Sequence, residues 1–247
     1  MKNIYKQLMS FIHKKSKENE LMAEIKAASK NPDDLKIYVF FRNFSIYFSY
    51  VFIKLKLSPN LLSTTWLLLL IGASISFSFN YNRLGGVLIL MHFIIDCCDG
   101  EVARVTKKMS KAGNDYERII HWSTNLFLLL GISIGLGNRY GSENVYLLCL
   151  FSLVFDSCFY YLTDQFYHII RRNHNYVQLF KIGKYVFLFM PTSTILFMLG
   201  GFFDLLIYSI IIWTIISFTL FFLFAILYFK EEFKYRPIKQ DSPPNDL

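Results

Sequence analysis

The stretch from Leu61 to Phe79 contains no charged residue, and several similarly apolar stretches follow it, up to about Phe229. An α-helix needs about 20 mostly apolar residues to cross the hydrocarbon core of a bilayer. The first stretch therefore has the length and the composition of a membrane-spanning helix. We expect an all-α, polytopic membrane protein.

The composition of the 247 residues agrees with this class. Hydrophobic residues make up 54% of the chain, and the mean hydropathy of +0.36 is too high for an ordinary soluble domain. The net charge of +8 is concentrated in a few polar stretches, which suits contact with anionic membrane lipids and anionic phosphate substrates. No basic stretch carries a motif for reading DNA or RNA, so no nucleic-acid partner is expected.

Apolar runs and turn residues divide the chain into six predicted spanning helices. Their approximate bounds are residues 61–79, 84–104, 113–136, 145–170, 185–199 and 204–229. Residues 35–56 mix aromatic with basic side chains, a pattern typical of an amphipathic juxtamembrane helix that lies in the membrane interface. We divide the chain into a polar cytoplasmic N-terminal segment (1–34), a membrane domain (35–230) and a cytoplasmic tail (231–247).

Lysine and arginine are distributed unevenly among the polar segments. They are frequent in the N-terminal segment, in residues 104–111 and 171–184, and in the tail, whereas residues 80–83 and 137–144 hold one each. Basic connections usually face the cytoplasm. Both termini are therefore expected in the cytoplasm, and the expected location is a bacterial inner membrane.

Two carboxylates, Asp96 and Asp99, lie three residues apart inside one of the apolar stretches. Ionisable groups at membrane depth are costly unless they are partnered, so they mark functional sites. In a helix this pair shares a face with Gly100, Ala103 and Arg104. The most suitable partner for such a pair is a metal cation.

A second polar pattern follows after a lysine-rich link. Gly113, Glu117 and His121 are spaced four residues apart and share a face of the next predicted helix. Two adjacent antiparallel helices can therefore present Glu117 and His121, together with Asp96 and Asp99, to one cavity.

The spacing of these residues resembles the signature of the CDP-alcohol phosphotransferase family, also called the CDP-alcohol phosphatidyltransferase family. That signature runs D-x2-D-G-x2-A-R, then eight or nine residues, then G-x3-D-x3-D. The matching residues are Asp96, Asp99, Gly100, Ala103, Arg104 and Gly113. At the last two positions, Glu117 and His121 stand where the family has aspartates.

The resemblance implies transfer of a phospho-alcohol group from a CDP-activated alcohol, or from CDP-diacylglycerol, to a hydroxyl acceptor. CMP is released, and the products belong to phospholipid or related glycolipid biosynthesis. The implied cofactor is Mg²⁺ or Mn²⁺, as two ions held by Asp96, Asp99, Glu117 and His121. The implied substrate-binding residues in the signature are Gly100, Ala103, Arg104 and Gly113. A homodimer is common in the family.

Glu117 and His121 are also the predicted catalytic residues. Glutamate keeps the charge of the aspartate that it replaces but is one methylene longer. A neutral imidazole can bind a metal or accept the proton of an attacking hydroxyl, since its reference pKa of about 6.5 is close to neutrality. The alternative for His121 is a packing role in a substituted, inactive site.

Residues 59–63 resemble the P-N-x-x-T/S entrance to the family's first span, which implies that Asn60 and Ser63 face the nucleotide. Capping of the helix start is the alternative for both. Asp156, in the fourth predicted span, is expected to serve either structural hydrogen bonding or the acceptor site.

Two other functions fit the sequence. One is a degenerate, non-catalytic member of the family, and the other is a small transporter that uses the Asp96–Asp99 pair for ions. Transporters more often show internal repeats and broken helices, and we find no repeat in this sequence.

Overall fold

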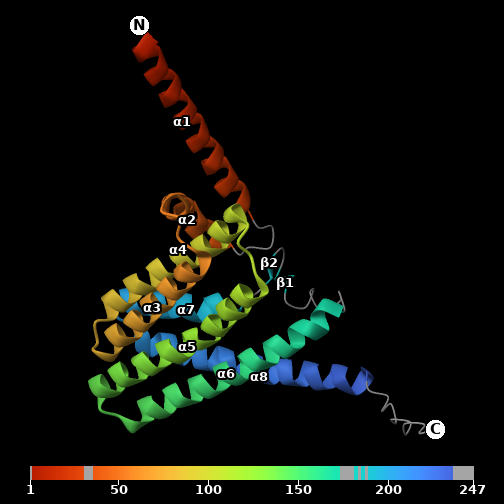
Figure 1. Cartoon of the computed structure of the whole chain (residues 1–247). Coiled ribbons are helices and arrows are strands. Elements are labelled where there is room, and N and C mark those ends of the chain that lie inside the picture. Colours follow the sequence, from red (N-terminus) through yellow and green to blue (C-terminus); the bar gives the residue numbers. More distant parts are fainter. Residues whose placement is uncertain (1, 31–35, 173–180, 183–184, 187–188, 236–247) are drawn as a thin grey trace, which may run out of the picture.

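The computed structural model describes residues 2–30, 36–172, 181–182, 185–186 and 189–235. This part contains eight α-helices and one pair of short strands (Figure 1). The helices are α1 (Lys2–Ala28), α2 (Lys36–Lys54), α3 (Pro59–Ser78), α4 (Asn82–Thr106), α5 (Lys111–Tyr140), α6 (Glu143–Arg172), α7 (Phe189–Phe202) and α8 (Leu206–Tyr235).

The all-α class is confirmed, and the helices α3 to α8 fall on the six predicted spans. Three segments of the described chain are long and apolar enough to cross a membrane: Pro59–Ser78, Lys111–Tyr140 and Leu206–Lys230. A shorter apolar helix covers Ser193–Phe202. The full number of six spans remains a prediction.

The start of the fifth predicted span was wrong. We expected a helix from about Tyr185, but α7 begins at Phe189. Tyr185 and Val186 instead form the strand β2, which pairs antiparallel with β1 (Lys181–Ile182). A short apolar run has no period that separates a strand from a helix, so the sequence alone did not locate this boundary.

Helix α3 lies against both α4 and α5, whereas α6 packs on α5 and α8. Glycines allow α3 and α5 to touch: a Cβ at Gly131 would lie 2.1 Å from the carbonyl oxygen of Ser74, and one at Gly135 would lie 2.0 Å from that of Phe77. Ser74 Oγ also donates to the carbonyl oxygen of Phe127 over 2.6 Å. Small residues commonly permit such close contact between membrane helices.

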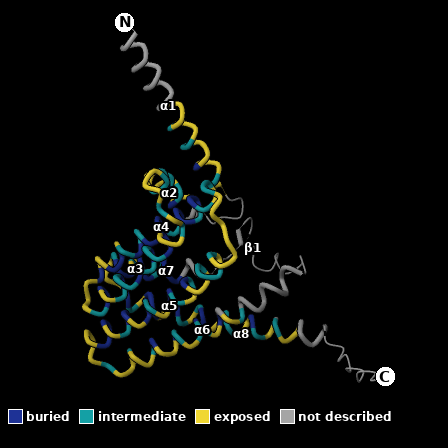
Figure 2. The backbone as a smooth tube through the Cα atoms, in the orientation of Figure 1, coloured by how far each residue is buried: buried dark blue, intermediate teal, exposed yellow. Residues whose placement is uncertain are grey.

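The core follows the inner faces of α3, α4 and α5, where Trp66, Ile89 and Leu128 are fully buried. Figure 2 shows the exposed residues on the outer faces of the bundle. Large apolar side chains such as Leu68 and Ile134 are among them. Apolar outer faces are expected of helices whose solvent is lipid.

The two N-terminal helices lie beside one end of this bundle. Helix α2 packs on α4, and the C-terminal part of α1 contacts both α2 and α4, while the rest of α1 projects away (Figure 1). Helix α2 covers most of the predicted juxtamembrane segment, residues 35–56. Its placement in the membrane interface remains a prediction.

Candidate active site

Helices α4 and α5 are joined by a short link whose two ends are fixed by local chemistry. Lys107 ends α4 in the left-handed conformation, with φ 55°. Ser110 caps α5, because its hydroxyl accepts a hydrogen bond from the Gly113 amide over 3.0 Å. The two helices that carry the acidic and imidazole groups therefore run in opposite directions, and α3 packs against both of them (Figure 1).

Asp96 on α4 and Glu117 and His121 on α5 form a cluster. One ligand atom from each of the three lies within 4.8 Å of the other two. His121 Nε2 is 3.4 Å from Asp96 Oδ1 and 3.7 Å from Glu117 Oε1. The structure thus brings together three of the four predicted metal ligands.

The fourth predicted ligand, Asp99, is buried beside this cluster and is 3% exposed. Its Oδ2 accepts two hydrogen bonds from α3: one from Ser63 Oγ over 2.7 Å and one from Trp66 Nε1 over 2.9 Å. These bonds fix the orientation of the carboxylate. Ser63 therefore contacts Asp99 directly and holds it from the neighbouring helix.

A pocket of about 490 Å³ opens above these groups, at the ends of α3, α4 and α5. Eight predicted site residues line it: Asn60, Ser63, Asp99, Gly100, Ala103, Arg104, Gly113 and Glu117. Glu117 belongs both to the pocket and to the cluster. Asp96 and His121 lie one helical turn farther into the bundle.

The two signature glycines leave room at the wall of this pocket. A Cβ at Gly100 would lie 3.1 Å from Nη1 of Arg104, so the guanidinium covers the space that a side chain would take. A Cβ at Gly113 would lie 3.3 Å from Asn60 Oδ1. A larger residue at either position would narrow the pocket.

Asn60 and Ser63 do not cap the start of α3. The cap is Ser58, whose Oγ accepts a hydrogen bond from the Leu61 amide over 3.2 Å. Both predicted residues instead line the pocket. Capping, the alternative reading of the sequence, is therefore excluded for this pair.

Three basic residues, Arg104, Lys108 and Lys111, lie on the pocket wall toward the link between α4 and α5. Arg104 Nε donates to the carbonyl oxygen of Ala28 at the end of α1 over 2.9 Å. The pocket therefore combines carboxylates at its base with cations near the link. This arrangement suits a ligand that carries phosphate groups and approaches a divalent cation.

The donor set fits a hard divalent cation. Two carboxylate oxygens and one imidazole nitrogen converge from two helices. The carboxylates are the ligands that Mg²⁺ and Mn²⁺ prefer, whereas the imidazole is a softer ligand than the aspartate of the family signature. Trp66 lies against His121, with ring centroids 4.9 Å apart, and thereby shields one side of the imidazole. A rigid, partly dry setting of this kind holds metal ligands in place.

A sequence model of the CDP-alcohol phosphatidyltransferase family matches residues 56–225. This chain belongs to that family. The match begins just before α3 and ends within α8, so it covers the pocket and the three helices that line it. The resemblance that the signature implied is confirmed.

An archaetidylinositol phosphate synthase of Pyrococcus horikoshii is 30% identical to this chain over 82 residues. The aligned residues make up 33% of this chain and 44% of that protein. The chain thus matches less than half of the relative's length.

Sequence reasoning missed one residue that contacts the site and one buried acid on the same helix as the two signature aspartates. Trp66 donates a hydrogen bond to Asp99 and packs against His121 with its ring tilted by 36°. Glu101 is completely buried next to the signature residue Gly100. A tryptophan three residues after Ser63 shares its helix face, and a buried indole N–H needs an acceptor, which is the signal that was available. Glu101 carries no comparable signal, because a single acidic residue near a helix end is usually exposed.

Proposed function

We propose that this protein transfers a phospho-alcohol group from a CDP-activated alcohol to a hydroxyl acceptor and releases CMP. The observation that carries the proposal is the cluster of Asp96, Glu117 and His121 beneath a pocket lined by the family signature. A nucleotide diphosphate placed in that pocket would have its phosphates next to the carboxylates. The products would be phospholipids or related glycolipids.

We propose Mg²⁺ or Mn²⁺ as the cofactor, with Asp96, Glu117 and His121 as ligands and Asp99 as the further carboxylate of a two-ion site. When bound, such ions neutralise charge on the transferred phosphoryl group and on the leaving group. The protein's own contribution is to hold these metal ligands in place. Ser63 and Trp66 keep Asp99 turned toward the site through their hydrogen bonds to its Oδ2.

Glu117 is a proposed proton acceptor for the attacking hydroxyl, and His121 is the other, in a state in which its Nε2 is not bound to the metal, because one lone pair cannot hold a cation and take a proton. His121 Nε2 points toward two carboxylates, and a carboxylate next to an imidazole orients its ring and stabilises its protonated form. Glu117 is the more exposed of the two side chains, 40% against 29% for His121, and lines the pocket directly. The acceptor hydroxyl would therefore meet Glu117 first, with His121 behind it.

The small residues of the pocket are the proposed seat of the cytidine nucleotide. Gly100, Ala103 and Gly113 present little more than backbone to the cavity, which permits close approach of a flat base and its ribose. Asn60, whose side chain lies beside Gly113, supplies both a hydrogen-bond donor and an acceptor.

The acceptor alcohol is proposed to carry a phosphate. The name of the Pyrococcus horikoshii relative describes a product that contains inositol phosphate, and in this chain Arg104, Lys108 and Lys111 line the pocket. Guanidinium and ammonium groups bind phosphate oxygens through charge-assisted hydrogen bonds. A polyol phosphate would thus be preferred over an uncharged polyol.

We further propose six spans with both termini in the cytoplasm, in a bacterial inner membrane. Under this arrangement the lysine-rich link between α4 and α5 faces the cytoplasm, and so does the pocket beside it. A soluble polyol phosphate would reach the pocket from that side. An activated lipid would enter from the bilayer.

The test is release of CMP by the purified protein in lipid vesicles, with CDP-diacylglycerol and candidate polyol phosphates as substrates. We expect release with Mg²⁺ or Mn²⁺, none after chelation, and none from Asp96→Asn. The control is Asp115→Asn, since Asp115 also lies on α5 but pairs with Arg118 on the helix surface. Full activity in Asp96→Asn would refute the proposed site. A wild-type protein that releases no CMP from CDP-diacylglycerol with any of the polyol phosphates would favour the non-catalytic alternative.

A further inference from the structure

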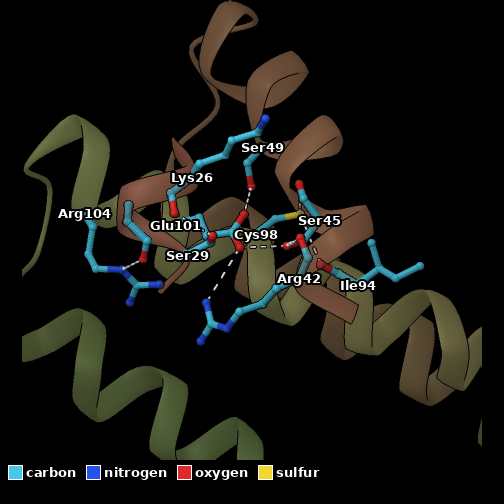
Figure 3. A network of polar contacts seen from close by, with 10 residues as sticks. Lys26, Ser29, Arg42, Ser45, Ser49, Ile94, Cys98, Glu101 and Arg104 are labelled. Atoms are coloured by element: carbon cyan, nitrogen blue, oxygen red, sulfur yellow. Dashed lines mark hydrogen bonds and ion pairs between the residues drawn. The ribbon is translucent and has the colours of Figure 1, made fainter. Parts of the chain in front are cut away.

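Glu101 lies on α4 between signature residues but takes no part in the pocket. Its side chain is completely buried and faces α2 (Figure 3). Ser45 Oγ donates to Oε1 over 2.7 Å, Ser49 Oγ donates to Oε2 over 2.6 Å, and Arg42 Nη1 lies 3.7 Å from Oε1. Both oxygens of one carboxylate are thus engaged by a single neighbouring helix.

The three partners form one inward face of α2, since residues 42, 45 and 49 follow a helical spacing of three and four. Cys98, one turn before Glu101, adds a weaker contact, because its thiol lies 3.5 Å from the carbonyl oxygen of Ser45. Cys98 and Glu101 thus mark the face of α4 that meets α2.

That face is opposite the face that carries the predicted metal ligands. At 100° per residue, Asp96 and Asp99 lie roughly half a turn around α4 from Cys98 and Glu101. Helix α4 therefore has α2 on one side and the pocket on the opposite side. Any rotation of α4 that moved its two aspartates would also break the bonds to Glu101.

The outward face of α2 is apolar and aromatic. Its exposed side chains include Phe40, Phe44, Tyr47 and Val51. A helix with hydroxyl and guanidinium groups turned inward and aromatic rings turned outward is suited to lie against lipid. If α2 lies in the membrane interface as predicted, it separates the lipid from the helix that carries Asp96 and Asp99.

We propose that Glu101 is a positioning residue that fastens α4 to α2 and thereby fixes the rotation of the two signature aspartates. The effect on catalysis rests on the proposed function, whereas the fastening itself does not. A carboxylate suits this task because it accepts several hydrogen bonds at once, and its burial makes each missing donor costly.

The decisive variants are Glu101→Ala and Glu101→Gln. The first removes both acceptor oxygens. The second keeps one oxygen and replaces the other with an amide nitrogen, whose N–H can donate a hydrogen bond to a serine hydroxyl. The double variant Ser45→Ala/Ser49→Ala removes the donors and leaves α4 unaltered, so it serves if Glu101→Ala does not fold. The matched control is Ser209→Ala, which removes another buried serine hydroxyl that bridges two helices, here α8 to the Leu196 carbonyl of α7.

Three measurements on monodisperse protein in lipid separate the outcomes. Hydrogen exchange of the α2 amides reports whether α2 is held on α4. Mn²⁺ affinity, measured by electron paramagnetic resonance, reports whether the two aspartates keep their positions. The separate values of KM and kcat for CMP release report the effect on catalysis. We expect Glu101→Ala and the double serine variant to speed exchange in α2 and to weaken Mn²⁺ binding about tenfold. Glu101→Gln should stay near wild type.

Unchanged α2 exchange in both Glu101→Ala and the double serine variant would overturn the fastening. Faster exchange with Mn²⁺ affinity equal to that of Ser209→Ala would overturn the positioning role and leave Glu101 as a packing residue. If the wild type binds Mn²⁺ but releases no CMP, the proposed function fails, while the exchange and Mn²⁺ measurements still decide the role of Glu101.

Discussion

At the scale of single residues, the departures from the family signature lie at the centre of the site. His121 occupies a position where the family has an aspartate, and its Nε2 nevertheless faces Asp96 and Glu117. The imidazole therefore lies where a carboxylate of the family would be expected. This geometry favours the proposed roles of ligand or base, and the alternative is a structural ion pair with the two acids.

The role of His121 can be tested by restoring the family residue. We expect His121→Asp to retain or raise CMP release, since a carboxylate can perform both proposed tasks. His121→Ala should lower it at least about tenfold, through loss of a metal ligand or its support. The measurement is the initial rate at saturating Mn²⁺, and equal rates in the two variants would show that His121 only packs.

The sequence made part of this site predictable at residue scale. The cluster of Asp96, Glu117 and His121 could be predicted, because the helical spacing of these residues and the short link between their helices leave few other arrangements. Glu101 could not, since its partners lie on α2, more than fifty residues earlier in the sequence. The hydrogen bond from Trp66 to Asp99 likewise depends on how α3 is rotated, and no local pattern specifies that rotation.

At the scale of elements, α3 and α5 come into backbone contact toward the end of the bundle away from the pocket. The backbone carbonyls of Ser74 and Phe77 lie where side chains would be if Gly131 and Gly135 were any other residue. The same two helices carry Ser63 and Trp66 (α3) and Glu117 and His121 (α5) at their other ends. The helices themselves were predictable from apolar length, but this contact was not, because glycine is common in membrane helices for several reasons.

Replacement of Gly131 should therefore damage the fold. We expect Gly131→Ala to destabilise the protein by about 1–3 kcal/mol, because the added methyl group meets a backbone carbonyl that has little freedom to move. Gly72→Ala is the matched control on α3, where the new methyl group would lie 3.5 Å from Leu88 Cδ1, an ordinary contact. It should be neutral or slightly stabilising. Thermal unfolding in detergent compares the two, and equal midpoints would contradict the close contact.

At the scale of the whole molecule, a buried polar group connects four helices in the half of the bundle away from α2. Asp156 Oδ1 accepts hydrogen bonds from Asn125 Nδ2 and Trp213 Nε1, each over 3.0 Å. Ser193 Oγ donates to Asn125 Oδ1 over 2.9 Å. Of the two roles that the sequence left open for Asp156, these contacts favour structural hydrogen bonding.

Removal of Asp156 tests that role. Asp156→Ala leaves two buried donors without an acceptor and should destabilise the protein by about 2–5 kcal/mol, whereas Asp156→Asn keeps an oxygen and should cost less. The unfolding midpoint of each variant is the measurement. A variant that unfolds like wild type but has lost CMP release would instead place Asp156 at the acceptor site.

A smaller contact joins the start of α4 and the end of α5 to the turn between α7 and α8, at the end of the bundle away from the pocket. Arg139 donates two hydrogen bonds to Asp204, over 2.8 and 3.1 Å, and Asn82 donates a third. The bonds from Arg139 lower the pKa of Asp204 below its ordinary value of 3.8. The contribution of this carboxylate to stability is therefore complete above pH 3.8 and is lost as the pH falls through the lower, folded value.

Comparison with Asp204→Asn isolates that contribution. Asparagine tolerates the left-handed backbone of this position, where φ is 58°, so the substitution removes charge without backbone strain. We expect wild type to be more stable than the variant near neutral pH, by less than about 1 kcal/mol because the pair is exposed. The difference should disappear in acid. A difference in unfolding midpoint that persists unchanged at pH 3 would contradict the ion pair.

The capped start of α5 bears on how this signature can vary between relatives. Positions in α5 are counted from Ser110, so Gly113, Glu117 and His121 keep their phase whatever precedes the cap. An extra residue between Lys107 and Ser110 would only enlarge a surface bend. A residue inserted between Ser110 and Glu117 would rotate the side chains of Glu117 and His121 by about 100° around α5, away from α4. A spacer of eight or nine residues is therefore harmless before the cap, while the four-residue intervals beyond it are obligatory.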